Sequence, residues 1–417
     1  MSTRIMSRDA VSVAALAIFI VFGTNGFIFA SWAARIPSVT ETLGLSTGQM
    51  GAVLLVGAIG SLVSLPLTGA VVDRIGLKAT VRFGGTMAVV AGAVIASGLL
   101  IQSVWVVTVG MVLFGSGVAF WDVAQNIGGA DVEHRLGRTI MPKLHAAFSG
   151  GAVLGALVGA GLSAAGVALP LHLFGIMVVV VVIIAVVPRY FLPHDAGHAP
   201  EAGGSPDQLA GAAIPVPEAS GPKPNMLDAW RHPRTVLIGV VVLGATLTEG
   251  AGNDWISKGA VDGLGSSESA GAGLFAVFVG AMTLARWFGG RVIDRIGRVA
   301  ALRISMVSAA IGLTTYSLAG TYWLSAVGAV LWGLGAALAF PMGMSAAADD
   351  PRKAAARVAV VSTIGYIAFL AGPPFLGFLG DQLGLRHALL VILVPILVAL
   401  ALAGVTRKEG APAEVRG

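Results

Sequence analysis

The most constraining feature of this sequence is a series of twelve long apolar stretches. Each has roughly the 20 residues or more that an α-helix needs to cross the hydrocarbon core of a membrane. Since a lipid-exposed backbone must satisfy its own hydrogen bonds, uninterrupted runs of this length indicate helices rather than barrel strands. We therefore expect an all-α membrane protein. The predicted spans are 10–34, 47–72, 79–101, 104–129, 143–168, 170–192, 234–256, 269–292, 299–320, 322–347, 355–379 and 385–405.

Composition supports a membrane protein and excludes several chemistries. Of the 417 residues, 56% are hydrophobic and only 11% are charged, which is too little polar surface for a soluble globular protein. The first stretch is too long for the core of a secretory signal peptide, so we interpret it as the first span. The sequence contains no cysteine, no Gly-rich phosphate loop and no histidine cluster with metal spacing. We therefore expect no enzyme, no cofactor and no metal site, and transport energy would have to come from gradients.

The basic residues indicate how the chain is oriented. The net charge is +5, and most Lys and Arg residues fall in alternate predicted loops. Only Arg35, Lys258 and Arg386 fall in loops on the other side. Because basic loops stay in the cytoplasm, this asymmetry predicts a multi-pass protein of the inner or plasma membrane with both termini cytoplasmic.

A polar segment divides the spans into two sets of six. Residues 193–225 are dense in Pro, Gly, Ala and Ser, with almost no large apolar side chain, so they cannot bury enough surface to fold. We predict an N-terminal six-helix bundle at 1–192, a flexible cytoplasmic linker at 193–233, and a C-terminal bundle with a short cytoplasmic tail at 234–417.

One short string occurs once in each half. Asp73-Arg74-Ile75-Gly76 returns as Asp294-Arg295-Ile296-Gly297, each time after the second span of its half. Such a repeat is typical of a transporter made of two similar bundles. We predict a cytoplasmic gate in which these carboxylates meet helix N-termini and the arginines reach Asp131 or Glu133. The alternative is that the arginines only set the orientation of the chain in the membrane and that the glycine only forms a turn. The gate residues would be Asp73, Arg74, Gly76, Asp294, Arg295 and Gly297.

Polar and aromatic side chains inside the spans are the candidates for solute binding, because polar groups at membrane depth are costly. Aromatic rings beside amide and carboxyl groups suit a solute with an apolar face and hydroxyl or amide edges, as sugars have. The alternative is that the polar residues join helices and that Trp32 and Trp255 anchor the chain at the membrane surface. The predicted binding residues are Asn25, Phe29, Trp32, Trp121, Gln125, Asn126, Asn253 and Asp254.

Two carboxyl groups are candidates for proton coupling. Asp122 has no basic residue in its own span. A carboxyl group at this depth can bind a proton and release it when water or a cation arrives. The alternative is permanent pairing or permanent protonation. Glu249 is a second titrating site, a solute ligand or a partner of Arg286. For Arg286 we favour a local contact near the cytoplasmic end, and for His145 a hydrogen bond at that end.

These strings also resemble a known family. The repeated Asp-Arg-Ile-Gly resembles the cytoplasmic signature of the major facilitator superfamily. The run Trp121-Asp122-Val123-Ala124-Gln125-Asn126 resembles the acid-x-Ala-x-Asn pattern of its fucose-permease branch, whose members are sugar/proton symporters. The resemblance covers the chain except the linker and tails. It implies two pseudo-symmetric six-helix bundles around a central cavity, lined by the first, fourth, seventh and tenth spans. It also implies proton coupling at Asp122 with Asn126 as a polar neighbour.

The sequence also departs from its nearest patterns. In the fucose-permease branch an aspartate follows shortly after the first-span asparagine, where this sequence has Phe27-Ile28-Phe29. Drug/proton antiporters usually have an arginine near the start of the fourth span, where this sequence has Met111. We expect a secondary transporter that moves a small polar solute by alternating access with proton symport. The alternative is an exporter or uncoupled facilitator of a polar metabolite or drug-like compound. A non-transporting receptor is a third interpretation. The expected partners are solute, protons and the lipid bilayer, without nucleic acid, and we expect a monomer.

Overall fold

The computed structural model describes residues 8–138, 140–192, 226–350 and 353–408, and within them every regular element is a helix. Twelve helical spans are long and apolar enough to cross a membrane, which confirms the predicted all-α architecture. The N-terminal spans are α1 (Arg8–Ala33), α3 (Thr47–Ile75), α4 (Leu77–Leu100), α5 (Val104–Leu136), α6 (Met141–Ala164) and α7 (Leu169–Val186) with η1 (Val187–Tyr190). The C-terminal spans are α9 (Pro233–Leu264), α10 (Glu268–Ile296), α11 (Arg298–Leu318), α12 (Tyr322–Ala336) with α13 (Ala339–Ala347), α14 (Ala354–Leu383), and α15 (Leu385–Leu389) with η3 (Leu390–Ile392), α16 (Leu393–Leu402) and η4 (Ala403–Thr406).

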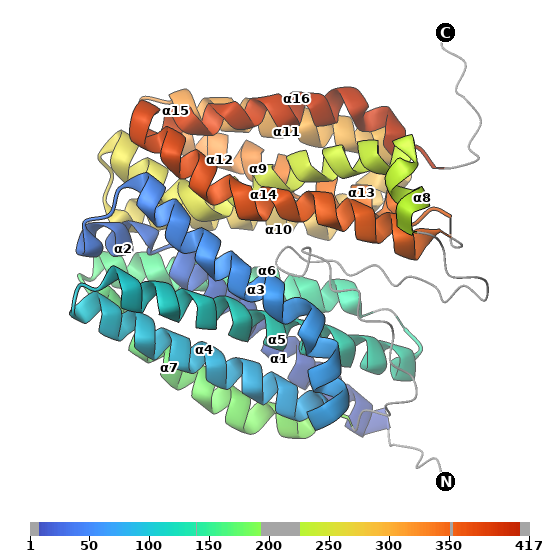
Figure 1. The fold of residues 1–417 in the computed structure, drawn as a ribbon, viewed down its shortest axis with the longest axis horizontal. Helices are drawn as coiled ribbons and strands as arrows, with labels where there is room; N and C mark the ends of the chain where they lie inside the picture. Colours follow the sequence, from blue (N-terminus) through green and yellow to red (C-terminus); the bar gives the residue numbers. More distant parts are fainter. Residues whose placement is uncertain (1–7, 139, 193–225, 351–352, 409–417) are drawn as a thin grey trace.

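The spans form two bundles that lie side by side with their long axes aligned (Figure 1). One bundle holds α1 to α7 and the other α9 to α16. Two short helices mark opposite ends of the molecule: α2 (Ile36–Leu43) lies at one end and α8 (Met226–Arg231) at the other. We call these the α2 end and the α8 end. The first helix begins, and η4 ends, at the α8 end (Figure 1).

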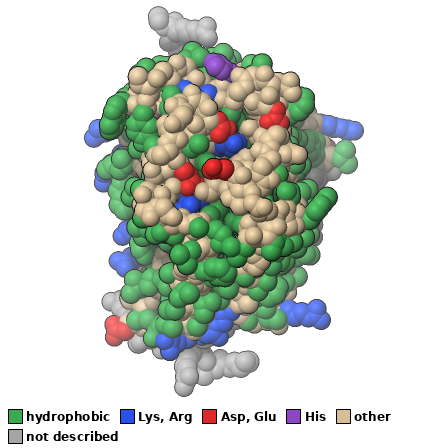
Figure 2. All heavy atoms as spheres, turned by 90° about the vertical axis from the view of Figure 1, so that its left-hand side faces the viewer, with side chains coloured by type: hydrophobic (Ala, Val, Ile, Leu, Met, Phe, Trp, Pro, Cys, Tyr) green, Lys and Arg blue, Asp and Glu red, His purple; other side chains and the backbone are tan. Residues whose placement is uncertain are grey.

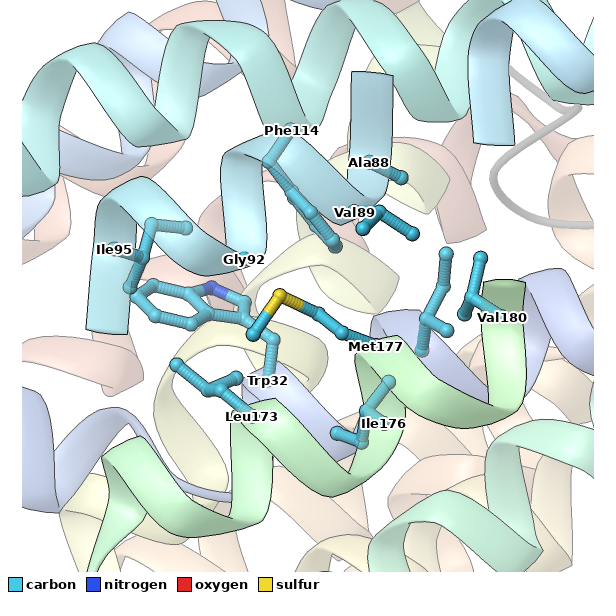
Figure 3. A pocket seen from close by; sticks show the side chains of 11 residues that line it. Trp32, Ala88, Val89, Gly92, Ile95, Phe114, Leu173, Ile176, Met177 and Val180 are labelled. Atoms are coloured by element: carbon cyan, nitrogen blue, oxygen red, sulfur yellow. The ribbon is translucent and has the colours of Figure 1, made fainter. Parts of the chain in front are cut away.

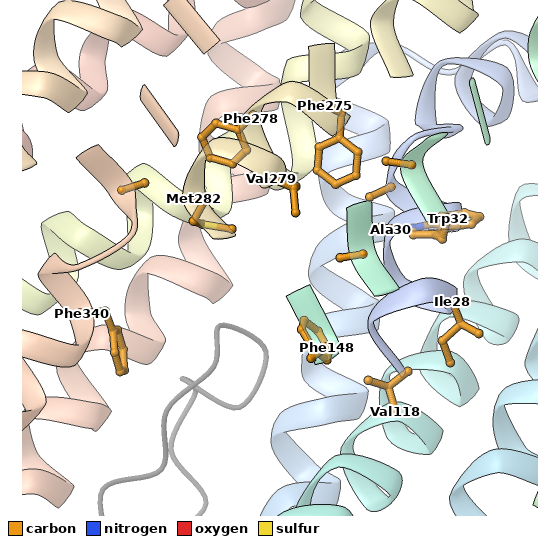
Figure 4. Packing of buried hydrophobic residues seen from close by; sticks show 14 of the residues in the cluster. Ile28, Ala30, Trp32, Val118, Phe148, Phe275, Phe278, Val279, Met282 and Phe340 are labelled. Atoms are coloured by element: carbon orange, nitrogen blue, oxygen red, sulfur yellow. The ribbon is translucent and has the colours of Figure 1, made fainter. Parts of the chain in front are cut away.

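Two helix pairs join the bundles: α6 packs against α10, and α3 against α14. In each pair, the fifth span of one half packs against the second span of the other half. The interface therefore follows the internal repeat. Phe275 and Val279 lie on the side of α10 that faces α6 (Figure 4). Gly51 of α3 is in direct contact with α14, where a Cβ atom built on it would lie 2.5 Å from the carbonyl oxygen of Pro373. The two bundles therefore approach at backbone distance.

Two spans extend furthest beyond their predicted ends, and charged residues pair within both extensions. We expected the fourth and seventh spans to end near 129 and 256, but α5 continues to Leu136 and α9 to Leu264. Asp131 and Arg135 form an i,i+4 ion pair in the extension of α5, and Lys258 and Asp262 form another in α9. Such pairs stabilise a helix where isolated charges would indicate a loop.

The end of the predicted linker is helical. Residues 193–225 lie outside the described residues, but 226–231 form α8. Ala229 of this helix is buried against Ala356, Val360 and Ile364 of α14. The part of the 193–233 segment nearest the second bundle is therefore attached to that bundle, which differs from the flexible tether that we predicted there.

Candidate functional site

The polar residues of α5 form one hydrogen-bonded group. Asp122, Gln125 and Asn126 lie at i, i+3 and i+4, so they share one side of the helix. Gln125 Nε2 donates to Asp122 Oδ1 at 2.7 Å, and Asn126 Nδ2 donates to the backbone carbonyl of Asp122 at 2.9 Å. These two bonds use the amide nitrogens and one carboxylate oxygen, and the remaining side-chain oxygens of the three residues have no partner in the described structure. Asp122 Oδ2, Gln125 Oε1 and Asn126 Oδ1 are buried without a hydrogen-bond partner among the described residues.

Asn25 of α1 adds a fourth unpartnered group at the same level. The two helices run antiparallel, and their contacts pair Trp32 with Phe114 and Ile18 with Gly128. This register places Asn25 level with the turn of α5 that contains Asp122. The side chain of Asn25 is 0% exposed, and neither its oxygen nor its nitrogen has a partner in the described structure. Since buried polar groups are costly without hydrogen bonds, this part of the bundle is suited to a polar ligand.

The second bundle presents a buried ion pair. Arg286 Nη2 of α10 donates to both carboxylate oxygens of Glu249 in α9, each at 2.8 Å. Arg286 Nε donates to the carbonyl of Ala337 at 3.2 Å. This carbonyl lies between α12 and α13, and it is free because Pro341, four residues later, has no N–H to donate to it. The local contact near the cytoplasmic end that we favoured for Arg286 is therefore wrong: its partner is Glu249.

The polar groups of the two bundles lie within electrostatic range of one another. Asp122 of α5 interacts in this way with Tyr366 of α14, and Arg286 of α10 with His145 of α6. The His145 ring meets Phe22 edge-on, with centroids 5.3 Å apart. Its Nε2 has no hydrogen-bond partner in the described part of the chain, so the predicted hydrogen bond is not made by that atom. Tyr366 was missed, although a tyrosine inside a predicted span was a usable signal.

Two predicted binding tryptophans lie inside the N-terminal bundle, away from these groups. Trp32 packs near Phe114 and lines a small apolar cavity of about 30 Å³ between α1, α4, α5 and α7 (Figure 3). Trp121 is fully buried against Gly84 and Gly85 of α4, and its indole N–H has no partner among the described residues. Both rings therefore fill the interior of the bundle.

The remaining predicted binding residues lie on α1 and α9. Phe29, Asn253 and Asp254 are all half-buried. Asp254 shares one side of α9 with Ser257, whose hydroxyl donates to the carbonyl of Ala34 in the other bundle at 3.1 Å. The side of α9 that carries Asp254 is therefore directed at the N-terminal bundle. No ion pair or hydrogen bond to Asp254 occurs in the described ranges.

The predicted gate residues lie at the α8 end. Asp73, Arg74, Asp294 and Arg295 are exposed there. Gly76 and Gly297 end their helices with nearly identical dihedral angles, φ +81° and ψ 162° against φ +79° and ψ 160°. That conformation is essentially restricted to glycine, which explains why both copies of the string carry one.

The partners that we expected for the gate arginines are bound elsewhere. Asp131 pairs with Arg135 at 3.0 Å. Glu133 accepts hydrogen bonds from the backbone N–H groups of Ile140 and Met141. In the described residues, neither Arg74 nor Arg295 makes a hydrogen bond or ion pair to Asp131 or Glu133, so the predicted gate contacts are not formed in this state. Across the described residues, no hydrogen bond or ion pair joins the bundles through the six gate residues.

The polar contacts between the bundles are instead at the α2 end. Glu268, the first residue of α10, accepts hydrogen bonds from Arg35 Nε at 2.9 Å, from the N–H and hydroxyl of Ser38, and from Ser163 Oγ at 2.7 Å. Asp381 of α14 accepts from the Ser46 hydroxyl and from the first N–H groups of α3. Acidic and basic side chains lie close together near the middle of this end (Figure 2). Sequence reasoning missed both carboxylates, since an acidic residue at a helix end does not indicate a partner in another bundle.

Comparisons with known proteins agree with this architecture. Residues 250–417 match the family model described as Major Facilitator Superfamily. The chain is 30% identical over 395 residues to an uncharacterised transporter of the same superfamily from Yersinia pestis, covering 93% of this chain and 94% of that one. It is 29% identical over 386 residues to an uncharacterised transporter from Sinorhizobium fredii, covering 90% and 96%. It is also 26% identical over 392 residues to the membrane protein MosC of Rhizobium meliloti, covering 92% and 88%.

Solved structures share the fold at low sequence identity. The nucleoside transporter NupG matches with a TM-score of 0.72 and 14% identity, covering 94% of this chain and 98% of that one. FucP in the outward conformation matches with a TM-score of 0.59 and 14% identity, covering 94% and 99%. These structures support the arrangement of the helices, and the family and its relatives are transporters rather than enzymes. Because it is 30% identical over 93% of its length to a transporter of this type, the chain belongs to the major facilitator superfamily of membrane transporters.

Proposed function

We propose that the protein is a secondary transporter that moves a small, polar, sugar-like solute by alternating access, in symport with protons. The observation that carries this proposal is the buried polar group around Asp122, in which Asp122, Gln125 and Asn126 each keep one oxygen without a hydrogen-bond partner in the described structure. A carboxyl group at membrane depth with no ion pair in the described structure is suited to bind and release a proton. The resemblance to the fucose-permease branch supports the same assignment.

The solute would bind between the bundles. Asn25, Gln125 and Asn126 offer buried oxygens to the hydroxyl groups of a solute, and Asn253 and Asp254 approach from α9. Phe29 would supply an apolar face. Trp32 and Trp121 would act from inside the N-terminal bundle by holding α1, α4 and α5 in place. Glu249 would take part in proton coupling when its ion pair with Arg286 opens.

We further propose that the α8 end faces the cytoplasm. Two facts support this orientation. The basic residues that the alternation of loops assigns to the outside, Arg35, Lys258 and Arg386, belong to the α2 end, and the repeated strings Asp73-Arg74 and Asp294-Arg295 belong to the α8 end. The contacts of Glu268 and Asp381 would then close the outer side. The gate residues Asp73, Arg74, Gly76, Asp294, Arg295 and Gly297 would meet when the transporter opens outward.

Asp122→Asn tests the proton assignment. Purified protein would first be screened by thermal shift against sugars, amino sugars, nucleosides and polyols, because a true ligand stabilises the folded protein by mass action. Radiolabelled uptake of a stabilising solute into proteoliposomes would then be driven by a proton gradient. We expect Asp122→Asn to abolish gradient-driven accumulation and to keep solute counterflow, while Asp228→Asn, an exposed carboxylate in α8, behaves like the parent. Unchanged accumulation by Asp122→Asn contradicts the coupling proposal.

A second candidate is an exporter or uncoupled facilitator of a polar metabolite or drug-like compound. The observation that favours it is that both buried carboxylates already have partners: Glu249 is bound by Arg286, and Asp122 accepts a hydrogen bond from Gln125. Carboxylates held in this way need not exchange protons during transport. Solute counterflow that is independent of pH, without accumulation on a proton gradient, distinguishes this candidate from symport.

A further inference from the structure

A buried histidine lies beside the contacts that close the α2 end. His172 is in the first turn of α7 and is 3% exposed. Neither ring nitrogen has a hydrogen-bond partner among the described residues. Imidazole nitrogens in protein interiors are normally satisfied, so a histidine with both nitrogens unpartnered requires an explanation. Neither the gate nor the solute site proposed above uses this residue.

His172 and Arg35 are neighbours. A Cβ atom built on Gly159 of α6 would lie 3.8 Å from His172 Cε1 and 3.9 Å from Arg35 Cγ, so both side chains lie over the same glycine. The charges of Arg35 and Glu268 both act on His172. The segments of α1, α4 and α6 that reach this end, residues 21–33, 92–100 and 151–164, contain no charged residue. The Arg35–Glu268 ion pair is therefore the electrostatic environment of His172.

This ion pair joins the bundles. Arg35 is 3% exposed, and besides its bond to Glu268 it donates to the carbonyl of Val167, in the connection that leads into α7, at 3.1 Å. Glu268 belongs to the C-terminal bundle, and its donors Arg35, Ser38 and Ser163 belong to the N-terminal bundle. One carboxylate thus holds the start of α2 and the end of α6 in the opposite bundle, and loss of its bond to Arg35 would weaken the closure.

A proton on His172 would act on this ion pair directly. The imidazolium would be a second buried cation next to Arg35, at the positive N-terminal end of α7. The counter-charge that acts on it is Glu268, whose oxygens already accept hydrogen bonds from Arg35, Ser38 and Ser163. The imidazolium and the guanidinium would therefore compete for one carboxylate. If the α2 end opened, water would solvate both cations. By linkage, a state that binds a proton more tightly gains population as the pH falls.

We propose that His172 is a proton-binding site that controls closure of the α2 end. Neutral His172 is compatible with the Arg35–Glu268 ion pair and the closed state, and protonated His172 favours the open state. The inference rests on the proposed function in one respect, since opening of this end is one step of alternating access. It adds a proton site distinct from Asp122, next to the ion pair that joins the bundles.

Distance measurements on labelled protein test this inference. The chain contains no native cysteine, so spin labels can be attached to cysteines introduced at two exposed positions of the α2 end, Thr42 in α2 and Gln382 in α14. In lipid nanodiscs, lowering the pH from about 8 to about 5, the range in which histidine titrates, should move molecules into a longer-distance population. With one linked proton, the open-to-closed ratio changes at most about tenfold per pH unit.

Three variants make the result specific. We expect His172→Gln to keep the short distance at both pH values, and His172→Phe, which fills the apolar site, to do the same. His387→Gln removes an exposed histidine from the same end and should keep the full pH response. A pH response that persists in both His172 variants, or is absent from the parent, overturns the inference.

The Asp122→Asn variant separates the two proton sites. If His172 controls closure, the distance change with pH persists in Asp122→Asn, although gradient-driven uptake is lost. A distance change that disappears in Asp122→Asn and persists in His172→Gln assigns the response to Asp122 and overturns the inference while supporting the proposed function. Gradient-driven uptake by the parent tests the proposed function independently of either result.

Discussion

At the scale of single residues, the buried polar groups that the structure describes are of two kinds: some are paired with an opposite charge, and others keep unpaired atoms. Glu249 and Arg286 satisfy each other, with two hydrogen bonds of 2.8 Å. Asp122, Gln125 and Asn126 also bond to one another but leave three oxygens unpartnered in the described structure. The first pair therefore compensates its own burial, whereas the second group keeps acceptor atoms whose burial is not compensated.

The Glu249–Arg286 pair yields a stability prediction. Glu249→Gln leaves the Arg286 guanidinium, whose side chain is 16% exposed, without its counter-charge. Breaking a buried ion pair by removing one partner costs about 3–5 kcal/mol, whereas replacing both partners by neutral groups is far less harmful. We expect a clear fall in the thermal unfolding temperature in detergent for Glu249→Gln and partial recovery in Glu249→Gln/Arg286→Met.

A surface pair serves as the control for this prediction. The Lys353 side chain is 61% exposed and its ammonium lies 3.9 Å from Asp350. Exposed ion pairs contribute only about 0–1 kcal/mol. Lys353→Gln should therefore leave the unfolding temperature nearly unchanged. Equal effects of Glu249→Gln and Lys353→Gln would show that the interior pair does not stabilise the fold.

At the scale of helices, small residues and prolines decide how the spans meet. The tenth span is divided between α12 and α13 four residues before Pro341, and the carbonyl that this leaves free is bound by Arg286. The α3–α14 crossing depends on Gly51, which leaves room for the Pro373 carbonyl. A local feature of one helix thus determines a contact with another.

Gly51→Ala should disturb the closed α2 end. The added Cβ would lie 2.5 Å from the Pro373 carbonyl oxygen and 2.9 Å from Pro374 Cα, and these backbone atoms cannot move aside at low cost. We expect a larger long-distance population between labels at Thr42 and Gln382 at neutral pH. Gly150→Ala, where no atom lies within 4 Å, is the matched control and should leave the distances unchanged. Identical distance distributions for the two variants would show that α3 and α14 do not need this close contact.

At the scale of the whole molecule, the two bundles are joined at one end. Glu268 and Asp381 both come from the C-terminal bundle, and their donors all come from the N-terminal bundle. The candidate gate residues lie at the opposite end and make no such contact within the described ranges. If the α2 end is the outer one, the structure corresponds to a transporter closed to the outside.

Labelling of single cysteines in intact cells tests that orientation. A membrane-impermeant maleimide should label Thr42→Cys in whole cells, because α2 would face outward. It should label Asp228→Cys, in α8, only after the cells are permeabilised, and the cysteine-free parent not at all. Both positions are exposed, so burial does not limit either reaction. The reverse labelling pattern would place the α8 end outside and contradict the predicted topology.

The sequence by itself determined what depends on neighbours along the chain. The number of spans follows from the length of the apolar runs, because a lipid-exposed backbone must be helical to satisfy its hydrogen bonds. The repeated glycine at 76 and 297 follows from a helix ending that only glycine adopts. The grouping of Asp122, Gln125 and Asn126 follows from helical periodicity alone.

Only the tertiary structure decided contacts between residues far apart in sequence. Arg286 is 37 residues from Glu249, and Arg35 is 233 residues from Glu268. The orientation of Trp32 and Trp121 toward the inside of their bundle likewise depends on how α1 and α5 are rotated against α4. A side chain's own helix determines its level in the membrane, but the packing of the other helices determines what it faces. Long-range charge pairs and the closed end of the molecule were therefore outside the reach of sequence periodicity.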